Sequence, residues 1–403
     1  MTDTATIAEG GSGSIPVIHY DFTRTLPILS YYDELDELRE RDNGIFWNTL
    51  AQGFWSVLRY QDVREIYQMP SIFRSDSQDP MNPNPAQKFV PTHLNDDEHV
   101  QYRRLLTPWF SPAAVNSIQS MAREVCARHL DAIAARGRCD YVADFALLYP
   151  TEVFMRMMSL PAEDTTLFAP WLDVMFEGHH TTSHQKVIDA ANSIKGYFRE
   201  KIAERRRNPL DPVQDFVSFT LAAKVFGRPC TDDEILSLLW TLAIAGLHTT
   251  RVQMVHLMHH LAATPDDRTA VIADSSLIRN AVEESLRTHS LVAVEGRKLG
   301  QDIDFHGAPM KKDDMVWISV AAANRDPRVF RNPTAFDLHR APNPHLSFAA
   351  GPHRCLGSHL ARAEMAIAVQ EWNARIPEYG IQPGATIMER GGLLTPQSLP
   401  LEW

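Results

Sequence analysis

The chain has 403 residues, of which 44% are hydrophobic and 22% are charged. This composition is typical of a water-soluble globular protein large enough to enclose a cofactor. A net charge of −11 argues against a nucleic-acid partner, because nucleic acids select basic surfaces. The four cysteines form no close pair and no CxxC motif, which argues against a disulfide framework or a zinc site and favours a reducing cytoplasm.

The N-terminal segment MTDTATIAEGGSGSIPV is polar and rich in glycine and serine. It lacks the apolar core of a signal peptide and the long apolar run of a membrane anchor. We therefore expect residues 1–15 to form a flexible tail. No linker divides the remainder, so residues 16–403 are expected to form a single domain.

The first predicted elements are a strand over residues 53–60 and a helix from about Asp62. Residues 77–93 are rich in proline and asparagine and cannot hold a regular helix, so they predict a long loop. Long loops in compact domains are often functional. A further helix is predicted from Asp96 to about Phe110.

The clearest helix begins at Thr231, where Thr-Asp-Asp-Glu is a capping-box sequence. It continues to Pro265, a length of about 50 Å at about 1.5 Å per residue. Its centre is apolar on nearly all sides, so we expect it to cross the core. A helix and two short strands follow over residues 275–288, 303–306 and 315–320. These elements predict a mainly α fold, a helical bundle around a long central helix with a small β region.

The most informative segment is FAAGPHRCLG, residues 348–357. Two glycines flank Cys355 and let the backbone turn tightly and approach a flat ligand. The run from Leu356 has helical periodicity, so Cys355 lies at or just before a helix N-terminus. There the amide groups and the helix dipole stabilise a thiolate that can bind a metal. The alternative for a lone cysteine is a small buried hydrophobic residue.

The pattern Phe-x-x-Gly-x-x-x-Cys-x-Gly resembles the haem-binding loop of the cytochrome P-450 family, with its fixed positions at Phe348, Gly351, Cys355 and Gly357. The resemblance runs from about residue 50 to the end of the chain. It implies the cytochrome P450 fold, with a single haem-thiolate monooxygenase domain over residues 16–403 and one non-covalent haem b. It also implies that Cys355 is the metal ligand, an axial thiolate that favours O–O cleavage.

A second motif, Ala-Gly-Leu-His-Thr-Thr at residues 245–250, lies in the middle of the long helix. One interpretation is a packing notch in which threonine hydroxyls bond back to the preceding turn. The segment is also similar to the family's oxygen-activation motif. That similarity implies a helix that opens locally at Gly246 and a Thr249 hydroxyl that helps to deliver protons. The family's acid position holds His248, which can relay protons with its usual pKa of about 6.5 but offers no carboxylate.

Two further sets of residues match the family's supports for the haem. Glu284 and Arg287 form an ExxR pair on one helix face, and with Arg340 they are implied to form a buried structural network. The two haem propionates need cationic or hydrogen-bonding partners when buried. The residues that match the family's propionate contacts are His99, Arg103, Arg297 and His353.

The segments 89–92 and 291–312 most resemble the branch of the family that hydroxylates small terpenoids such as camphor. In that branch a tyrosine contacts the camphor ketone, and Gln87 takes its place here, so camphor itself is not expected. The implied pocket is mostly apolar and predicts a small or medium hydrophobic, terpenoid-like substrate, although its apolar members could equally be ordinary core. It comprises Gln87, Phe89, Val90, Thr241, Ile244, Ala245, Val292, Val294 and Leu394.

The resemblance therefore implies a monooxygenase that hydroxylates its substrate with O2 and two electrons. No reductase-like segment is attached, so the electrons are expected from a ferredoxin that an NAD(P)H-dependent ferredoxin reductase supplies. The ferredoxin is expected to dock near Cys355, where Arg103, Arg104, Arg354 and Arg362 offer positive charge. The protein is expected to be a cytoplasmic monomer.

Two alternatives stay open. His248 at the acid position suggests a peroxide-driven haem oxidase, or peroxygenase, although the retained Thr249 and Thr250 favour O2 as the oxidant. A non-catalytic haem-thiolate sensor or binding protein is the third possibility. It is disfavoured because a sensor has no need of a proton-delivering hydroxyl.

Overall fold

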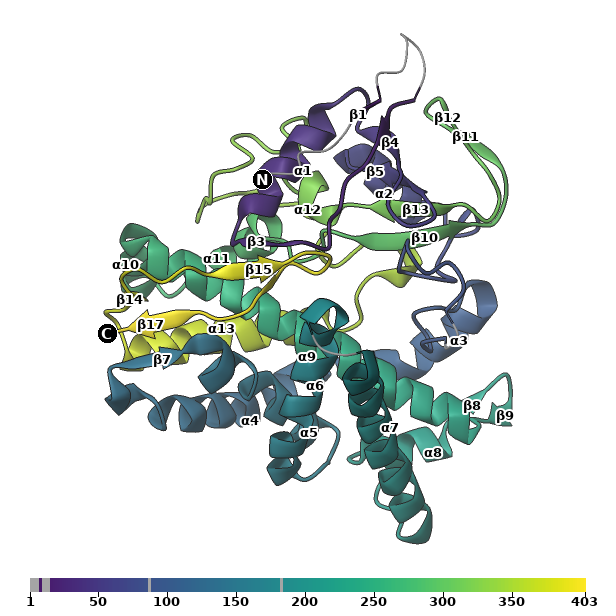
Figure 1. Cartoon of the computed structure of the whole chain (residues 1–403). Coiled ribbons are helices and arrows are strands. Elements are labelled where there is room, and N and C mark those ends of the chain that lie inside the picture. The colour runs from purple at the N-terminus through teal and green to yellow at the C-terminus, as the bar shows by residue number, and fades with distance from the viewer. Residues whose placement is uncertain (1–6, 9–14, 86–87, 182–183) are drawn as a thin grey trace.

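The computed structural model describes residues 7–8, 15–85, 88–181 and 184–403. A larger helical part and a smaller sheet part pack against each other, with the sheet part at the top of Figure 1. The long helix α9 (Asp232–Ala263) crosses the helical part diagonally. The predicted mainly α fold around a long central helix, with a small β region, is confirmed.

The helices of the larger part surround α9 on several sides (Figure 1). Two core clusters fill the space between them, one shared by α4, α9, α11 and α13 and the other by α5 to α9. The bounds are α3 (Asp96–Leu106), α4 (Pro112–Asp131), α5 (Tyr149–Met157), α6 (Thr165–Thr181), α7 (His184–Arg207), α8 (Phe216–Ala222), α10 (Pro265–Ala273), α11 (Leu277–Thr288) and α13 (Ser358–Arg375). Short 3-10 or π turns span Thr107–Phe110, Ala134–Arg136, Val142–Ala146, Ala162–Asp164 and Gly351–His353.

The smaller part is built on a sheet with the strand order β1-β2-β4-β5-β13-β10-β6. Trp317 lies at its centre, fully buried against a group of aromatic rings. Its strands are β1 (Ile7–Ala8), β2 (Val17–Ile18), β4 (Ile45–Asn48), β5 (Phe54–Val57), β6 (Phe73–Arg74), β10 (Glu295–Leu299) and β13 (Met315–Ile318). The helices that accompany it are α1 (Ser30–Glu40), α2 (Tyr60–Gln68) and α12 (Val320–Ala323).

The remaining strands of the described chain form small ladders that join distant segments. One ladder ties the C-terminus to the stretch after α4, and another ties it to the segment before α1. These ladders comprise β3 (Thr25–Pro27) with β15 (Met388–Arg390) and β16 (Thr395–Pro396), β7 (Arg138–Asp140) with β17 (Pro400–Glu402) and β14 (Gly380–Ile381), β8 (Lys224–Val225) with β9 (Arg228–Pro229), and β11 (Ile303–Phe305) with β12 (Ala308–Met310).

Two local expectations differ from the structure. The helix expected to reach about Phe110 ends as an α-helix at Leu106 and tightens into a 3-10 turn, because Pro108 cannot donate to the helical ladder. The tail expected over residues 1–15 contains β1, which pairs with β2, and its other residues up to 14 lie outside the described ones.

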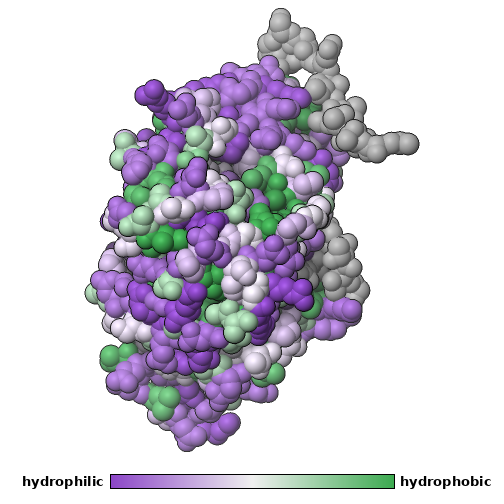
Figure 2. Space-filling view, turned by 90° about the vertical axis from the view of Figure 1, so that its left-hand side faces the viewer, coloured by the Kyte–Doolittle hydropathy of each residue, from purple (hydrophilic) through white to green (hydrophobic). Residues whose placement is uncertain are grey.

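The helix α9 is long and apolar enough to cross a membrane by length and composition alone. However, 72% of its most apolar window is buried inside the protein, as expected for a core helix. The molecular face in Figure 2 is mainly hydrophilic, with hydrophobic residues in small separate areas. The apolar side chains of α9 therefore pack in the protein core.

The capping box at the start of α9 generates a stability prediction. The Thr231 hydroxyl accepts from the Glu234 amide at 3.3 Å, and the Glu234 carboxylate accepts from the Thr231 amide at 2.7 Å. We expect Thr231→Ala to lower the free energy of unfolding by about 1 kcal/mol. Ser117→Ala, in the exposed middle of α4, is the control. Equal urea midpoints for both variants would contradict the prediction.

Candidate active site

The cysteine loop, residues 348–357, runs from the sheet part to the N-terminus of α13. The Cys355 amide donates to the Phe348 carbonyl at 2.8 Å and closes the loop. Gly351 has φ +69, and a Cβ at this position would lie 2.4 Å from the Tyr67 carbonyl oxygen. Only glycine therefore lets the loop pass this close to the end of α2.

Cys355 is the exposed cysteine, whereas Cys126, Cys139 and Cys230 are buried. Protein nevertheless surrounds it so closely that burial is the largest influence on its thiol and raises the pKa. The Gly357 amide and the charges of Arg103 and Arg362 act in the opposite direction. The Cys355 sulfur is accessible to solvent although protein atoms surround it on most sides, so we infer that it borders a space inside the protein.

The middle of α9 borders open space as well. Ala245 and Gly246 are exposed, although Ala243 and Leu247 beside them are buried. A Cβ on Gly246 would meet no atom within 4 Å, and the same holds for Gly357 beside the cysteine. In a helix that crosses the core, such exposure indicates accessible space beside α9 at these two residues.

The threonines of α9 bond back along the helix. The Thr249 hydroxyl donates to the Ala245 carbonyl at 2.7 Å, and Thr250 donates to Gly246 at 2.9 Å. The α-helix is continuous from Asp232 to Ala263, so the expected local opening of the helix at Gly246 is wrong for this structure.

His248 is buried on α9, and burial lowers its pKa well below the ordinary value. The positive charges of Arg251 and Arg390 lower it further. Arg251 is itself buried and donates to Asp173 of α6 at 2.8 Å. His248 is therefore neutral at physiological pH, and the ordinary pKa assumed from the sequence does not apply.

Four basic residues lie together beside the cysteine loop, and we call them the basic cluster: His99, Arg103, Arg297 and His353. The His99 and His353 rings stack with centroids 3.9 Å apart. Burial, followed by the neighbouring charges, lowers the pKa of His353 to about 3, and burial followed by Arg103 lowers that of His99 to about 4. Glu295 pairs with Arg297 at 2.7 Å. The cluster suits a ligand that carries carboxylates.

Glu284 is the centre of a buried polar network. Its carboxylate accepts from Arg287 Nε at 2.8 Å, from Arg340 Nε at 2.9 Å and from Asn343 Nδ2 at 3.0 Å. Arg287 also donates to the carbonyls of Asn324, Pro333 and Ala335. Because these bonds converge on Glu284 and Arg287 of α11, the network fixes residues 324–343 against that helix.

The sequence reasoning missed a second carboxylate next to the first. Glu283 accepts from His345 at 2.8 Å and from Arg362 at 2.6 Å, and these bonds help to lower its pKa to about 2 against the effect of burial. The guanidinium of Arg362 lies 4.3 Å from the Phe348 ring centroid. Glu283 thus joins α11, α13 and the cysteine loop. No local motif marks it, because its partners are about 60 and 79 residues away.

The predicted pocket residues fall into three groups. Phe89 and Val90 are half-buried on the long loop, and the Val90 amide donates to Ser237 of α9 at 3.0 Å. Leu394 is fully buried, and its carbonyl accepts a hydrogen bond from His256. Gln87 lies outside the described residues. The others lie on α9 (Thr241, Ile244 and Ala245) or just before β10, half-buried (Val292 and Val294).

Together the fold and the site define a class of protein. It is a helical protein with an enclosed, reachable thiol, an exposed stretch of core helix and a basic cluster around one internal space. The Cys355 sulfur can bind a metal, and the basic cluster can bind carboxylates. Gly246 and Gly357 have no neighbouring atom within 4 Å of an added Cβ, which leaves room for a flat ligand.

Comparisons with known proteins agree. The Cytochrome P450 family model matches residues 31–371, so the chain belongs to the cytochrome P450 family. A probable cytochrome P450 127A1 from Sinorhizobium fredii is 31% identical over 85% of this chain and 81% of its own. A steroid C26-monooxygenase from Mycobacterium tuberculosis is 30% identical over 81% of this chain and 87% of its own.

Solved structures confirm the cytochrome P450 fold. The crystal structure of CYP101J2 superposes with a TM-score of 0.86 at 27% identity, covering 96% of both chains. HmtN, a hydroxylase of himastatin biosynthesis, gives a TM-score of 0.82 at 31% identity over 93% of this chain and 96% of its own. The protein is therefore an oxidoreductase of the monooxygenase class, and membership of the family implies a haem cofactor.

The Glu284 network predicts a large loss of stability on its removal. We expect Glu284→Gln to lower the free energy of unfolding by about 3 kcal/mol, because two buried guanidinium groups lose their carboxylate. The control is Asp302→Asn, which removes an exposed pair with Lys311 and is expected to cost far less. Similar urea midpoints for the two variants would show that the network does not support the fold.

His248 predicts a dependence of stability on pH. The unfolded chain binds a proton at this position below about pH 6.5, whereas the folded chain does not, so stability falls as the pH drops through that value. In His248→Gln, the decrease in unfolding free energy between pH 6.5 and 5.5 should be smaller by about 1 kcal/mol. The control is His19→Gln, at an exposed site. An unchanged slope in His248→Gln would mean that His248 is charged in the folded protein.

Proposed function

We propose that the protein is a haem-thiolate monooxygenase that hydroxylates a small or medium hydrophobic substrate with O2 and two electrons from a ferredoxin. The observation that supports this most directly is the reachable thiol of Cys355 in an interior that the exposed stretch of α9 also borders. We place the protein in the cytoplasm as a monomer, with one haem b per chain in the domain over residues 16–403.

In this proposal each part of the site has a separate task. Cys355 would hold the haem through its thiolate, Phe348 packs on the supporting Arg362, and Gly351 and Gly357 would leave room for the cofactor beside the backbone. The bound haem supplies the activation of O2 and the oxidising equivalent for hydroxylation. The basic cluster holds the propionates. Structural support for the loop comes from Glu284, Arg287 and Arg340.

Proton delivery on the opposite side is assigned to Thr249. The Thr249 hydroxyl donates its proton to the Ala245 carbonyl. Its oxygen lone pairs can therefore still accept a hydrogen bond from a proton donor. Gly246 keeps the helix surface free of a side chain. His248 acts as a neutral group that orients its surroundings, since its lowered pKa prevents it from storing a proton near neutral pH.

The proposed substrate is apolar and terpenoid-like. Phe89, Val90, Ile244, Ala245, Val292 and Val294 offer mainly hydrocarbon surface, and Thr241 adds a buried hydroxyl with no hydrogen-bond partner among the described residues. Two relatives are named a steroid C26-monooxygenase and a mycinamicin IV hydroxylase/epoxidase. A pocket of this kind selects its substrate by shape complementarity and by the exclusion of water.

The ferredoxin is proposed to dock on the surface outside Cys355. Arg362 contributes little charge there, because Glu283 already pairs with it. Arg104 and Arg354 are exposed and remain the better candidates, with Arg103 half-buried between them and donating to the Arg354 carbonyl at 2.8 Å. Because the rest of the protein is acidic overall, these few exposed cations favour one orientation of the ferredoxin when the two proteins meet.

Turnover separates this proposal from its alternatives. Haem-loaded protein is supplied with a surrogate ferredoxin, its reductase, NADPH, O2 and a hydrophobic compound library, and products are analysed. We expect hydroxylated product that requires NADPH and O2. Product with peroxide alone would favour the peroxygenase, for which the neutral His248 is the motivating feature. No product under either condition would favour the sensor or binding protein.

Two adjacent threonines provide a matched test of proton delivery. Thr249→Val removes the half-buried hydroxyl, whereas Thr250→Val removes a buried one with the same back-bond. We expect Thr249→Val to lower product per NADPH about tenfold, since positioned proton donors contribute at least this much. Thr250→Val should stay within about twofold of the parent, and an equal loss in both would assign the effect to helix packing.

A further inference from the structure

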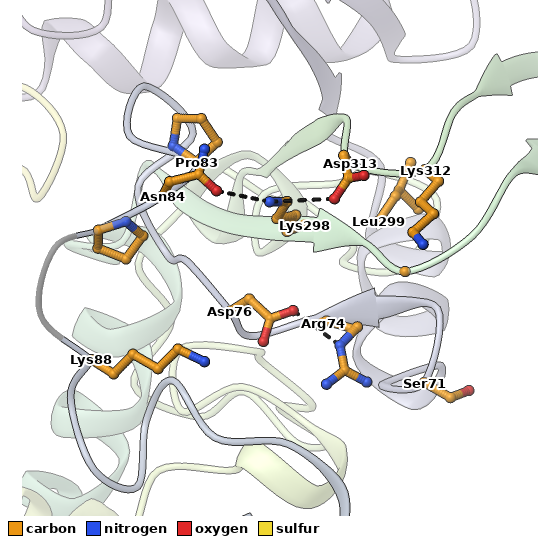
Figure 3. A pocket seen from close by; sticks show the side chains of 12 residues that line it. Ser71, Arg74, Asp76, Pro83, Asn84, Lys88, Lys298, Leu299, Lys312 and Asp313 are labelled. Atoms are coloured by element: carbon orange, nitrogen blue, oxygen red, sulfur yellow. Dashed lines mark hydrogen bonds and ion pairs between the residues drawn. The ribbon is translucent and has the colours of Figure 1, made fainter.

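A surface hollow lies outside the proposed active site. It measures about 560 Å³ and opens between the long loop, β6 and the segment that follows β10 (Figure 3). We call it the cationic hollow. The residues that line it include Arg74, Asp76, Lys88, Lys298, Lys312 and Asp313.

Positive charge predominates in the cationic hollow. Its lining has four cations and two carboxylates, in a protein whose net charge is −11. Arg74 is paired with Asp76 at 3.0 Å and with Asp96 at 3.1 Å, and Lys298 is paired with Asp313 at 3.3 Å. Neither Lys88 nor Lys312 has an ion-pair partner in the described chain, and the ammonium groups of both extend toward the hollow in Figure 3. Two cations are therefore left for a ligand.

The cationic hollow adjoins the proposed active site through two segments. Lys298 faces the hollow, and the preceding Arg297 faces the basic cluster, because successive residues of a strand point to opposite sides. On the loop, Lys88 lines the hollow, while Phe89 and Val90 pack toward α9. A bond of 3.0 Å from Lys298 Nζ to Asn84 Oδ1 already joins loop and strand.

We propose that the cationic hollow binds a small molecule through a phosphate or carboxylate group. Lys88 and Lys312 extend from opposite sides of the hollow in Figure 3, so an anionic group between them is attracted by both ammonium groups. This attraction would act on both the loop that carries Phe89 and Val90 and the segment after β10. The group is either a polar end of the substrate or part of a separate ligand.

Pyrophosphate is the probe for the first experiment, titrated calorimetrically into haem-loaded protein at low ionic strength. We expect saturable binding at one site that weakens with added salt. Lys88→Gln and Lys312→Gln should each weaken it about fivefold, the size expected for one exposed ion pair. Asp313→Asn should strengthen it, because Lys298 is released from its carboxylate. Absence of saturable binding would overturn the proposal.

Lys311→Gln is the matched control. Lys311 precedes Lys312 but pairs with Asp302 at 3.0 Å and does not line the hollow. We expect pyrophosphate affinity to change less than twofold in this variant. If Lys311→Gln weakened binding as much as Lys312→Gln, the attraction would be a diffuse surface effect and the proposal would fail.

A second arm separates the two sources of the anionic group. The ferric Soret shift is recorded for a hydrophobic carboxylic acid and for its methyl ester, each with and without pyrophosphate. Competition by pyrophosphate against the acid alone would assign the hollow to a polar end of the substrate. Binding without competition would assign it to a separate ligand. Calorimetric binding does not depend on turnover, so its failure is distinguishable from failure of the monooxygenase proposal.

Discussion

The carboxylate of Glu284 is the contact on which the geometry of the site depends. It collects hydrogen bonds from Arg287, Arg340, Asn343 and the Asp337 amide, and so fixes an irregular segment that no sheet or helix could hold. Ser347, at the end of that segment, donates to the Leu286 carbonyl of α11 immediately before the cysteine loop begins. The position of the thiol is therefore set by polar contacts to α11.

Two supports act on the same loop from different sides. Glu283 and Arg362 connect it to α13, and the close approach of Gly351 to Tyr67 connects it to α2. On the far side of the interior, α9 leaves Ala245 and Gly246 exposed while most of its remaining length is buried. A rigid loop opposite an open stretch of helix provides a preorganised interior, which suits a cofactor that must not move during reaction.

Sequence reasoning succeeded where the information is local. The capping box of α9, the glycine-flanked cysteine and the central apolar helix depend on neighbours within a few residues. It failed for the role of Glu283, whose partner Arg362 lies in a distant segment. It also failed for the neutral state of His248, which depends first on burial in the folded protein and then on the charges of Arg251 and Arg390. The expected opening of α9 is not seen, since the α-helix runs without a break from Asp232 to Ala263.

The carbon monoxide difference spectrum of the reduced protein tests the central claim most directly. The account predicts the red-shifted Soret band of a thiolate-ligated haem for the parent protein. The band should be retained in Cys230→Ser, where the cysteine is buried away from the loop, and lost in Cys355→Ser. A parent spectrum without that band, or a band that survives in Cys355→Ser, would contradict the assignment of Cys355 as the haem ligand.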